Sequence, residues 1–462
     1  MMKPMRMAVK KLAISGLITI LLAGCATKPE PHRLGFVAPL PEGYAEVLAA
    51  SGGIEIAQSL SEIFKDDKLR DLLARATAEN FSILLAKAQL KAAGFDVNVA
   101  SASQLPDLTL GGQASRQRNN AVSAASNQFA VSLDSQWEVD IWGSVSASVL
   151  LAEKGVEQAE WALAAAKQSV AAQMTQAYLR VIQAKRLAEI ADNEWQSYVS
   201  IEAAISNQFS LGLAGAQDLD NARSARYAAK NRLTADQLEI TRAKKSLNQL
   251  LAIYPGEPVA VGDAYPQVVA QIDAGVPSEL LMRRPDIQQA YLAVKQADTR
   301  AKIAYKALFP SFRLTGSLGR SSDTLSGLTS GNLNVWQLAA GIVQPLFDNG
   351  RRKAVLGQNS ALAEAAYYRY QETILAALTE VEILLSTHNA LIAQQQAMKQ
   401  SLHYAEIAET NARSDYANGL VSIFELLNAQ QSKYNAQRSV ENLRYASYQN
   451  RVSLALALGK AI

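Results

Sequence analysis

Carboxylates and histidines are the side chains that could carry catalysis in this chain, and neither group forms a recognisable catalytic motif. Glu138 and Asp140 could pair as general acid and base, but the same strand-to-helix junction recurs later with Asp348, which favours a structural role. His388 and His403 have no nearby cysteine and no histidine partner one helical turn away, which argues against a metal site. The sequence contains no nucleophile elbow, zinc-protease motif, P-loop or dinucleotide fingerprint. We therefore expect no enzyme, no catalytic cofactor and no bound metal.

The only cysteine, Cys25, has the sequence context of a lipid attachment site. A basic start leads into an apolar run from Leu12 to Leu22, which is too short for a stable membrane anchor and is typical of an export signal. The run ends in Leu22-Ala23-Gly24-Cys25, which resembles the bacterial lipoprotein box. We expect residues 1–24 to be removed as a signal peptide and Cys25 to carry lipid, including palmitate. An unmodified, buried cysteine is the alternative.

The composition excludes several classes of protein. Of the 462 residues, 19% are charged, below the roughly 25% typical of soluble proteins. The net charge is only +3, and no basic block is dense enough to indicate nucleic-acid binding. Beyond the signal, no apolar run is long enough for a transmembrane helix. If the mature chain crosses a membrane, it must do so with strands.

The sequence contains one unit written twice. The positions that recur at a constant offset of about 207 residues are Gly143, Gly212-Leu213, Asn221-Ala222 and Leu251, matched by Gly350, Gly419-Leu420, Asn428-Ala429 and Leu458. Because the offset stays constant over more than a hundred residues, chance identity does not explain it.

Two long proline-free stretches predict very long helices. No proline occurs between Pro106 and Pro255 or after Pro345, and these regions are rich in Ala, Gln, Glu, Lys and Leu. We expect rods over 144–211 and 351–418, each about 100 Å long at 1.5 Å per residue. Each rod is followed by a return helix, over 217–251 and 422–458, after a turn that contains glycine. The second rod also carries a coiled-coil seam of apolar residues at alternating spacings of four and three, with His388 at one seam position.

Before each rod the periodicity changes from that of a helix to that of a strand. Phe129, Val131 and Leu133 alternate with polar residues, which predicts a strand with one apolar and one polar face. The two predicted β-hairpins cover about 107–138 and about 311–345. The resulting division of the mature chain is 25–80 (lipidated segment and equatorial elements), 81–251 (first repeat), 252–282 (linker and equatorial segment) and 283–462 (second repeat).

Four strands are too few to close a barrel, and an open sheet edge in hydrocarbon leaves backbone groups unpaired at several kcal/mol each. Because known bacterial barrels begin at eight strands, at least two subunits are required. This argument leaves two, three and four subunits open.

Several motifs, in the same order, resemble the TolC-like outer-membrane efflux factors, and in particular their lipoprotein subgroup. They are Trp137 to Gly143, its echo Gln344 to Gly350, Arg284 to Ile287, Phe309 to Ser311, and Tyr416 to Gln430. The resemblance implies an α+β membrane protein: a homotrimer with a twelve-stranded β-barrel, four strands from each chain, continuous with an α-helical coiled-coil tunnel in the periplasm. It implies a lipid-anchored outer-membrane channel of a tripartite efflux pump, a passive exit duct for drugs or other small molecules. The implied partners are a periplasmic membrane-fusion adaptor and an inner-membrane transporter of the RND class.

The resemblance also implies roles for residues near the ends of the rods. Gly212, Leu213, Gly419 and Leu420 match the turns that contact the adaptor, although glycine there is also an ordinary helix cap. The gate residues implied by position are Tyr416, Phe424 and Asn428. Asp218 could supply negative charge to the gate, although an acid in the first turn of a helix is also an ordinary partner of the helix dipole. Asn428 replaces a residue that is often acidic in the family, so a ring of Phe424 side chains that closes by packing and dewetting is favoured over a charged gate.

A lipid-anchored coiled-coil structural protein or adhesin stalk is the rival interpretation. It explains the rods, but it does not explain four amphipathic strands. Outer-membrane trimers that conduct ions would exclude it, whereas a monomeric, water-soluble mature domain would exclude the channel.

Overall fold

The structure is a computed structural model that describes residues 28–32, 43–45, 55–56, 60–118, 125–268, 270–271, 277–330 and 334–460. The predicted signal peptide and Cys25 lie outside these residues. The chain forms two compact units. The first, called here the sheet unit, comprises Met1–Gly35, Leu90–Ala159 and Ala290–Tyr370; the second, the hairpin unit, comprises Phe36–Gln89, Glu160–Gln289 and Gln371–Ile462. Both units draw on both sequence repeats.

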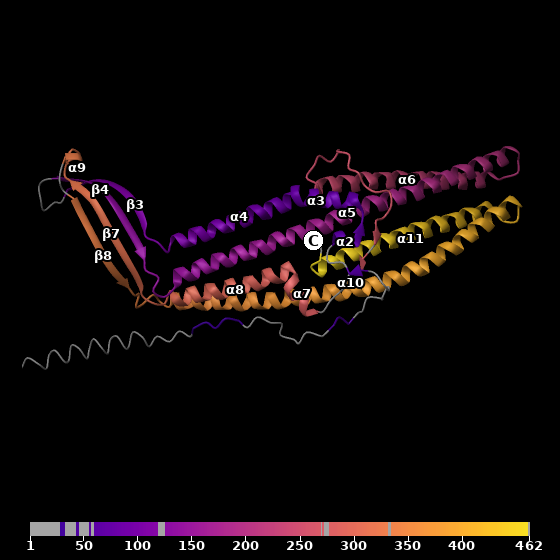
Figure 1. Cartoon of the computed structure of the whole chain (residues 1–462). Helices are drawn as coiled ribbons and strands as arrows, with labels where there is room; N and C mark the ends of the chain where they lie inside the picture. Colours follow the sequence, from indigo (N-terminus) through magenta and orange to yellow (C-terminus); the bar gives the residue numbers. More distant parts are fainter. Residues whose placement is uncertain are drawn as a thin grey trace, which may run out of the picture. The chain divides into compact units, whose positions relative to one another are not determined.

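The sheet unit contains one four-stranded antiparallel sheet (Figure 1). Its strands are β3 (Asp107–Arg118), β4 (Ala125–Glu138), β7 (Ser311–Ser322) and β8 (Asn334–Val343). Their order is β3-β4-β7-β8, so the two hairpins join through the pairing of β4 with β7. A short helix, α9 (Gly327–Ser330), lies in the connection between β7 and β8.

The main helices occur in pairs of equal length, as a duplication predicts. α4 (Phe81–Ala102) and α8 (Pro285–Lys306) have 22 residues each. α5 (Ser144–Ser210) and α10 (Arg351–Ala417) have 67 each. α6 (Ala216–Leu250) and α11 (Ile423–Ala457) have 35 each.

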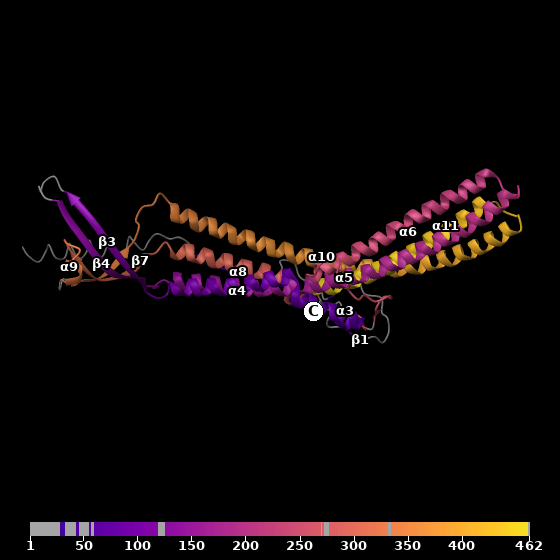
Figure 2. The same ribbon diagram turned by 90° about the horizontal axis from the view of Figure 1, so that it is seen from above.

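Within the hairpin unit, α6 returns beside α5 and α11 returns beside α10, which the two views in Figures 1 and 2 both show. The coiled-coil seam expected in α10 is buried at Ile374, Val381 and Leu385. His388 is only partly buried in that seam. Apolar side chains at helical spacing thus hold these helices together.

Short elements complete the hairpin unit. They are β1 (Glu55–Ile56), α2 (Leu60–Ile63), β2 (Phe64–Lys65), α3 (Asp67–Glu79), β5 (Gln267–Val268), β6 (Ala270–Gln271) and α7 (Pro277–Arg283). β1 pairs with β6, and β2 pairs with β5. The Tyr178 hydroxyl on α5 donates a 2.6 Å hydrogen bond to Asp66 and accepts one from the backbone N–H of Gly262. This tyrosine therefore joins both short segments to the long helix.

From the sequence we expected no apolar run beyond the signal that is long enough for a transmembrane helix. Judged by length and composition, this expectation was wrong. Among the described helices, α10 includes a stretch that is long and apolar enough to cross a membrane. Some of the residues that make this helix hydrophobic, such as Ile374 and Ala377, are buried within the fold.

Candidate functional site

The apolar face of the sheet can be followed as a row across all four strands. Leu110 lies opposite Leu133, Leu133 opposite Leu318, and Leu318 opposite Trp336. All four side chains are exposed in the single chain. A continuous row of exposed apolar residues is unusual for a surface in water but suits contact with lipid.

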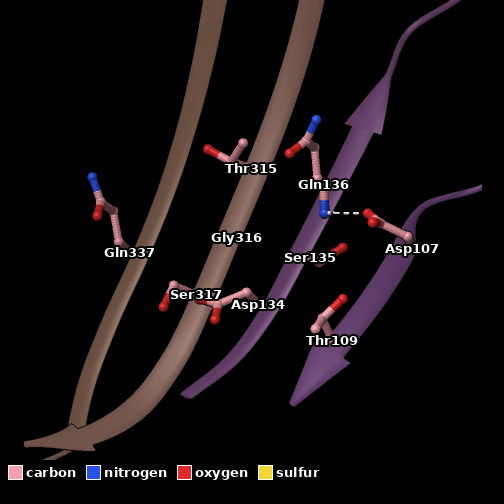
Figure 3. Close-up of a pocket in the computed structure, with 9 residues that line it drawn as sticks. All are labelled: Asp107, Thr109, Asp134, Ser135, Gln136, Thr315, Gly316, Ser317 and Gln337. Carbon is pink, nitrogen blue, oxygen red and sulfur yellow. Dashed lines mark hydrogen bonds between the residues drawn. The ribbon is translucent and has the colours of Figure 1, made fainter. Parts of the chain in front are cut away.

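The opposite face of the same strands is polar (Figure 3). The neighbouring row consists of Thr109, Asp134, Ser317 and Gln337, because successive residues of a strand point to opposite faces. These residues line a cavity of about 270 Å³. Next to them the backbone N–H of Gln136 donates a 2.9 Å hydrogen bond to Asp107. The sheet therefore has one apolar face and one polar face.

The junction between strand and helix is built in the same way in both repeats. Asp140 accepts hydrogen bonds from the backbone N–H groups of Val145 and Ser146 in the first turn of α5. Burial alone would raise the pKa of Asp140, but these hydrogen bonds hold it below its usual range. Asp348 caps α10 in the same manner and pairs with Arg352 at 3.0 Å. Asp140, one member of the pair considered for acid–base chemistry, is thus a helix cap, as is Asp348 at the equivalent junction.

Tryptophan anchors the same junction. The Trp142 indole N–H donates a 2.7 Å hydrogen bond to the carbonyl of Pro310, and its ring stacks on Phe309. The Trp137 indole N–H donates to the carbonyl of Gln104. Indole rings with a satisfied N–H and an exposed face suit the boundary between lipid and water.

The two turns at the ends of the long helices have nearly the same geometry. Gly212 has a φ of 71° and Gly419 a φ of 73°. The N–H of Leu213 donates to the carbonyl of Gln208, and that of Leu420 donates to the carbonyl of Asp415, both at 2.8 Å. This is a Schellman cap, which explains the repeated glycines by backbone conformation. The two leucines are 76% and 72% exposed, so each turn also presents an apolar tip.

The residues implied as a gate lie next to these tips and differ in their surroundings. The Tyr416 hydroxyl is 2.8 Å from Gln208, and its ring packs against a buried cluster that includes Leu219 and Ile423. Burial and the nearby charge of Asp218 raise the pKa of Tyr416. Asp218 itself accepts a hydrogen bond from the backbone N–H of Gly215 and so caps α6. Of the four candidate gate residues, Tyr416 and Asp218 are thus the two that contacts within the chain hold in place.

The other two implied gate residues are exposed on α11. Phe424 is 60% exposed, and Asn428 is exposed four residues later, on the same face of the helix. That face begins beside the cap in which Glu425 accepts a hydrogen bond from the backbone N–H of Ser422.

The sequence did not predict the charged residues that link the helices near the tips. Glu409 on α10 is buried and pairs with Arg413 and with Lys433 of α11. Further from the tips, Arg438 of α11 makes a 2.6 Å ion pair with Asp236 of α6 and so joins the two hairpins. Glu409 and Arg413 lie four residues apart on α10, but the pairs Glu409–Lys433 and Asp236–Arg438 each join two helices, so the linear spacing of their charges gave no signal.

Within the described residues, no group of three or more His, Cys, Asp or Glu side chains is placed to hold a metal ion. The described fold combines a sheet that has one apolar and one polar face with long paired helices.

The comparison with known proteins identifies the class. The family model of the outer membrane efflux proteins matches residues 72–252 and 276–460, so the chain belongs to this family. It is an efflux channel located in the outer membrane, and this supports the channel over the adhesin-like stalk.

Individual relatives match nearly the whole chain. The chain is 25% identical to the cation efflux system protein CusC of Escherichia coli strain K12, over 96% of this chain and 97% of CusC. It is 28% identical to the pyoverdine export outer membrane protein OpmQ of Pseudomonas aeruginosa, over 98% and 97%. A crystal structure of CusC matches with a TM-score of 0.82 at 25% identity, covering 94% of this chain and 99% of CusC. The open-state MtrE channel of Neisseria gonorrhoeae, at 24% identity, matches with a TM-score of 0.82, covering 94% and 98%.

Proposed function

We propose that the chain forms a homotrimer whose sheets close into one twelve-stranded barrel. The observation that carries this proposal is the four-stranded sheet with segregated faces and with β3 and β8 at its edges. In hydrocarbon these edges need partners, and β8 of one copy can pair with β3 of the next. The row from Leu110 to Trp336 then faces lipid, and the row from Thr109 to Gln337 lines the water-filled pore.

The long helices of three copies form the periplasmic tunnel, which receives cargo from a membrane-fusion adaptor and an inner-membrane transporter of the RND class. The adaptor contacts the tips at Gly212, Leu213, Gly419 and Leu420. Leucines that are mostly exposed on a capped, rigid turn support this role, because a fixed apolar tip can be buried by a partner at little cost in conformational entropy.

The gate lies beside the tips and closes by packing. Phe424 and Asn428 project from one face of α11, and three copies place three phenylalanine rings around the axis. Tyr416 and Asp218 act from behind this face by fixing the position of the helix ends. An apolar ring of this kind blocks ions by dewetting.

The lipid on Cys25 holds the amino terminus in the outer membrane. This cysteine lies outside the described residues, and its lipoprotein-box sequence is the support. A relative that is 25% identical, SilC of Salmonella typhimurium, is named a probable outer membrane lipoprotein. We expect no other cofactor and no catalytic activity.

The cargo consists of drugs or other small molecules. The names of relatives cover cations, pyoverdine, antibiotics and toluene. A polar pore face of Thr, Ser, Gln and Asp suits such a range, because it offers many weak hydrogen bonds and no strong site.

The experiment is to purify the full-length protein from outer membranes and to record current across planar bilayers. The proposal predicts oligomers that dissociate on heating and that conduct ions before heating. A monomeric, water-soluble mature protein that leaves the bilayer insulating would contradict it.

A further inference from the structure

A groove in the hairpin unit, away from the gate and the tips, gathers positive charge. Residues of α10, α11 and β5 line it, and it encloses about 480 Å³. Its polar lining consists of Gln395, Lys399, Arg444, Ser447, Tyr448 and Arg451. Two valines complete the lining, so it contains three cations and no carboxylate.

Arg451 is a partly buried cation in this groove. Its side chain is partly buried, and burial lowers the pKa of its guanidinium. Within the part of the chain that the structure describes, it makes no ion pair and no hydrogen bond. An arginine stays charged under these conditions, so a partly desolvated guanidinium with five N–H donors favours an anionic acceptor in the groove.

The other two cations are placed to act with Arg451. Arg444 lies two helical turns earlier on α11 and therefore on the same face. Its guanidinium is 4.8 Å from the centre of the Tyr265 ring, which orients it without neutralising its charge. Lys399 faces the groove from α10 and, among the described residues, has no ion pair.

Among the described residues, no neighbouring group makes an ion pair with these three cations. Glu441, on the same helix, is buried and accepts a 2.7 Å hydrogen bond from Tyr265. Burial and the charge of Arg451 lower the pKa of His388, which favours its neutral form. The amide of Gln395 and the hydroxyl of Tyr448 donate to backbone carbonyls.

We propose that this groove binds a compact oxyanion that carries phosphate or carboxylate groups. Arg451 contacts the oxyanion by two parallel N–H donors, a geometry that suits both groups. Ser447 lies four residues before Arg451, on the same face of α11, and adds a hydroxyl donor. Lys399 and Arg444 neutralise the remaining charge at the rim. The bound anion joins α10 to α11 and so stabilises the middle of this hairpin.

The test uses the full-length protein in detergent and titrates inorganic phosphate, and separately citrate, at constant ionic strength. Thermal unfolding and calorimetry report binding. We expect saturable stabilisation by at least one of the two anions. Arg451→Gln should raise the dissociation constant about tenfold or more, as expected for the loss of a charged hydrogen bond.

Two surface variants keep the test independent of folding problems at Arg451. Lys399→Gln should raise the dissociation constant about two- to fivefold, since it removes one exposed charge. Lys245→Gln is the matched control, because this exposed lysine of α6 does not line the groove, and it should leave binding unchanged.

Three results would overturn the proposal. In the first, neither anion binds saturably. In the second, Arg451→Gln and Lys399→Gln bind as the wild type does, so binding lies elsewhere. In the third, Arg451→Gln separates the subunits while neither anion has any effect, which would make the groove a contact with a carboxylate of a second copy.

Discussion

At the scale of single residues, Tyr416 and Phe424 differ although both lie at the same end of the hairpin unit. Tyr416 is fixed by its hydrogen bond to Gln208 and by its packing on the buried cluster. Phe424 is mostly exposed in the single chain. We therefore propose that Tyr416 supports the helix ends and that Phe424 narrows the pore.

Replacing Phe424 by alanine should therefore increase single-channel conductance, because it removes the apolar ring that we propose excludes water. The free energy of unfolding should change by less than about 0.5 kcal/mol, since the side chain is exposed. Planar bilayer recording checks the conductance. Tyr227→Ala, at a similarly exposed aromatic residue on α6, is the control and should conduct as the wild type does. Equal conductance for Phe424→Ala and the wild type would remove this residue from the gate.

At the scale of elements, the tip turn of α10 depends on a left-handed backbone at Gly419. An alanine there meets no steric neighbour, but its φ of 73° costs about 1–2 kcal/mol for a residue with a Cβ. Gly419→Ala should therefore speed hydrogen exchange of the tip amides by about 5- to 30-fold. Hydrogen–deuterium exchange measured by mass spectrometry tests this.

Gly357 offers the matched control, because it lies inside α10 with free space around its Cα. There an alanine should stabilise the helix by about 0.5–1 kcal/mol. Opposite effects of the two substitutions would establish that conformation, and not space, fixes the glycine at the tip. Similar effects would contradict this explanation.

The buried Glu409 makes the tip region sensitive to acid. Burial alone would raise its pKa, but hydrogen bonds and charge from Arg413 and Lys433 hold the pKa below its usual range. A lowered pKa in the folded state means that the carboxylate stabilises the fold above the unfolded value of about 4.3, and that this is lost as pH falls through the folded value. Unfolding at pH 7 and at progressively lower pH checks this. Glu409→Gln should flatten the profile, and an unchanged profile would show that another group titrates.

The long elements could be predicted closely from the sequence, and the contacts between them could not. α5 ends at Ser210 and α10 at Ala417, one residue before each expected end, because proline and glycine act locally on the backbone. The short elements around β1 and β2 depend on pairing with segments about 200 residues away, which no local pattern encodes. The ion pair of Arg438 with Asp236 and the groove at Arg451 also join residues that are far apart in the sequence, so no local pattern predicts them.

At the scale of the whole molecule, two independent features attach the protein to the membrane, namely the proposed barrel and the proposed lipid. Cys25→Ser should therefore weaken or redirect anchoring while oligomers still form, because strand pairing does not require the acyl chains. Fractionation of membranes and gel analysis without heating measure both effects. Complete loss of oligomers in this variant would show that the strands do not insert independently.

Closure of the sheet between copies is the central claim, and disulfide cross-linking across its edges tests it most directly. In a Cys25→Ser background, Thr109→Cys on β3 is combined in turn with cysteine at Val335, Gln337, Ala339 or Gly341 of β8, all on the same face of the sheet. We predict that one pair links β3 of one copy to β8 of the next, giving bands of two and three chains and none larger. The absence of links between chains at every pair, or a ladder that continues beyond three, would contradict a closed trimeric barrel.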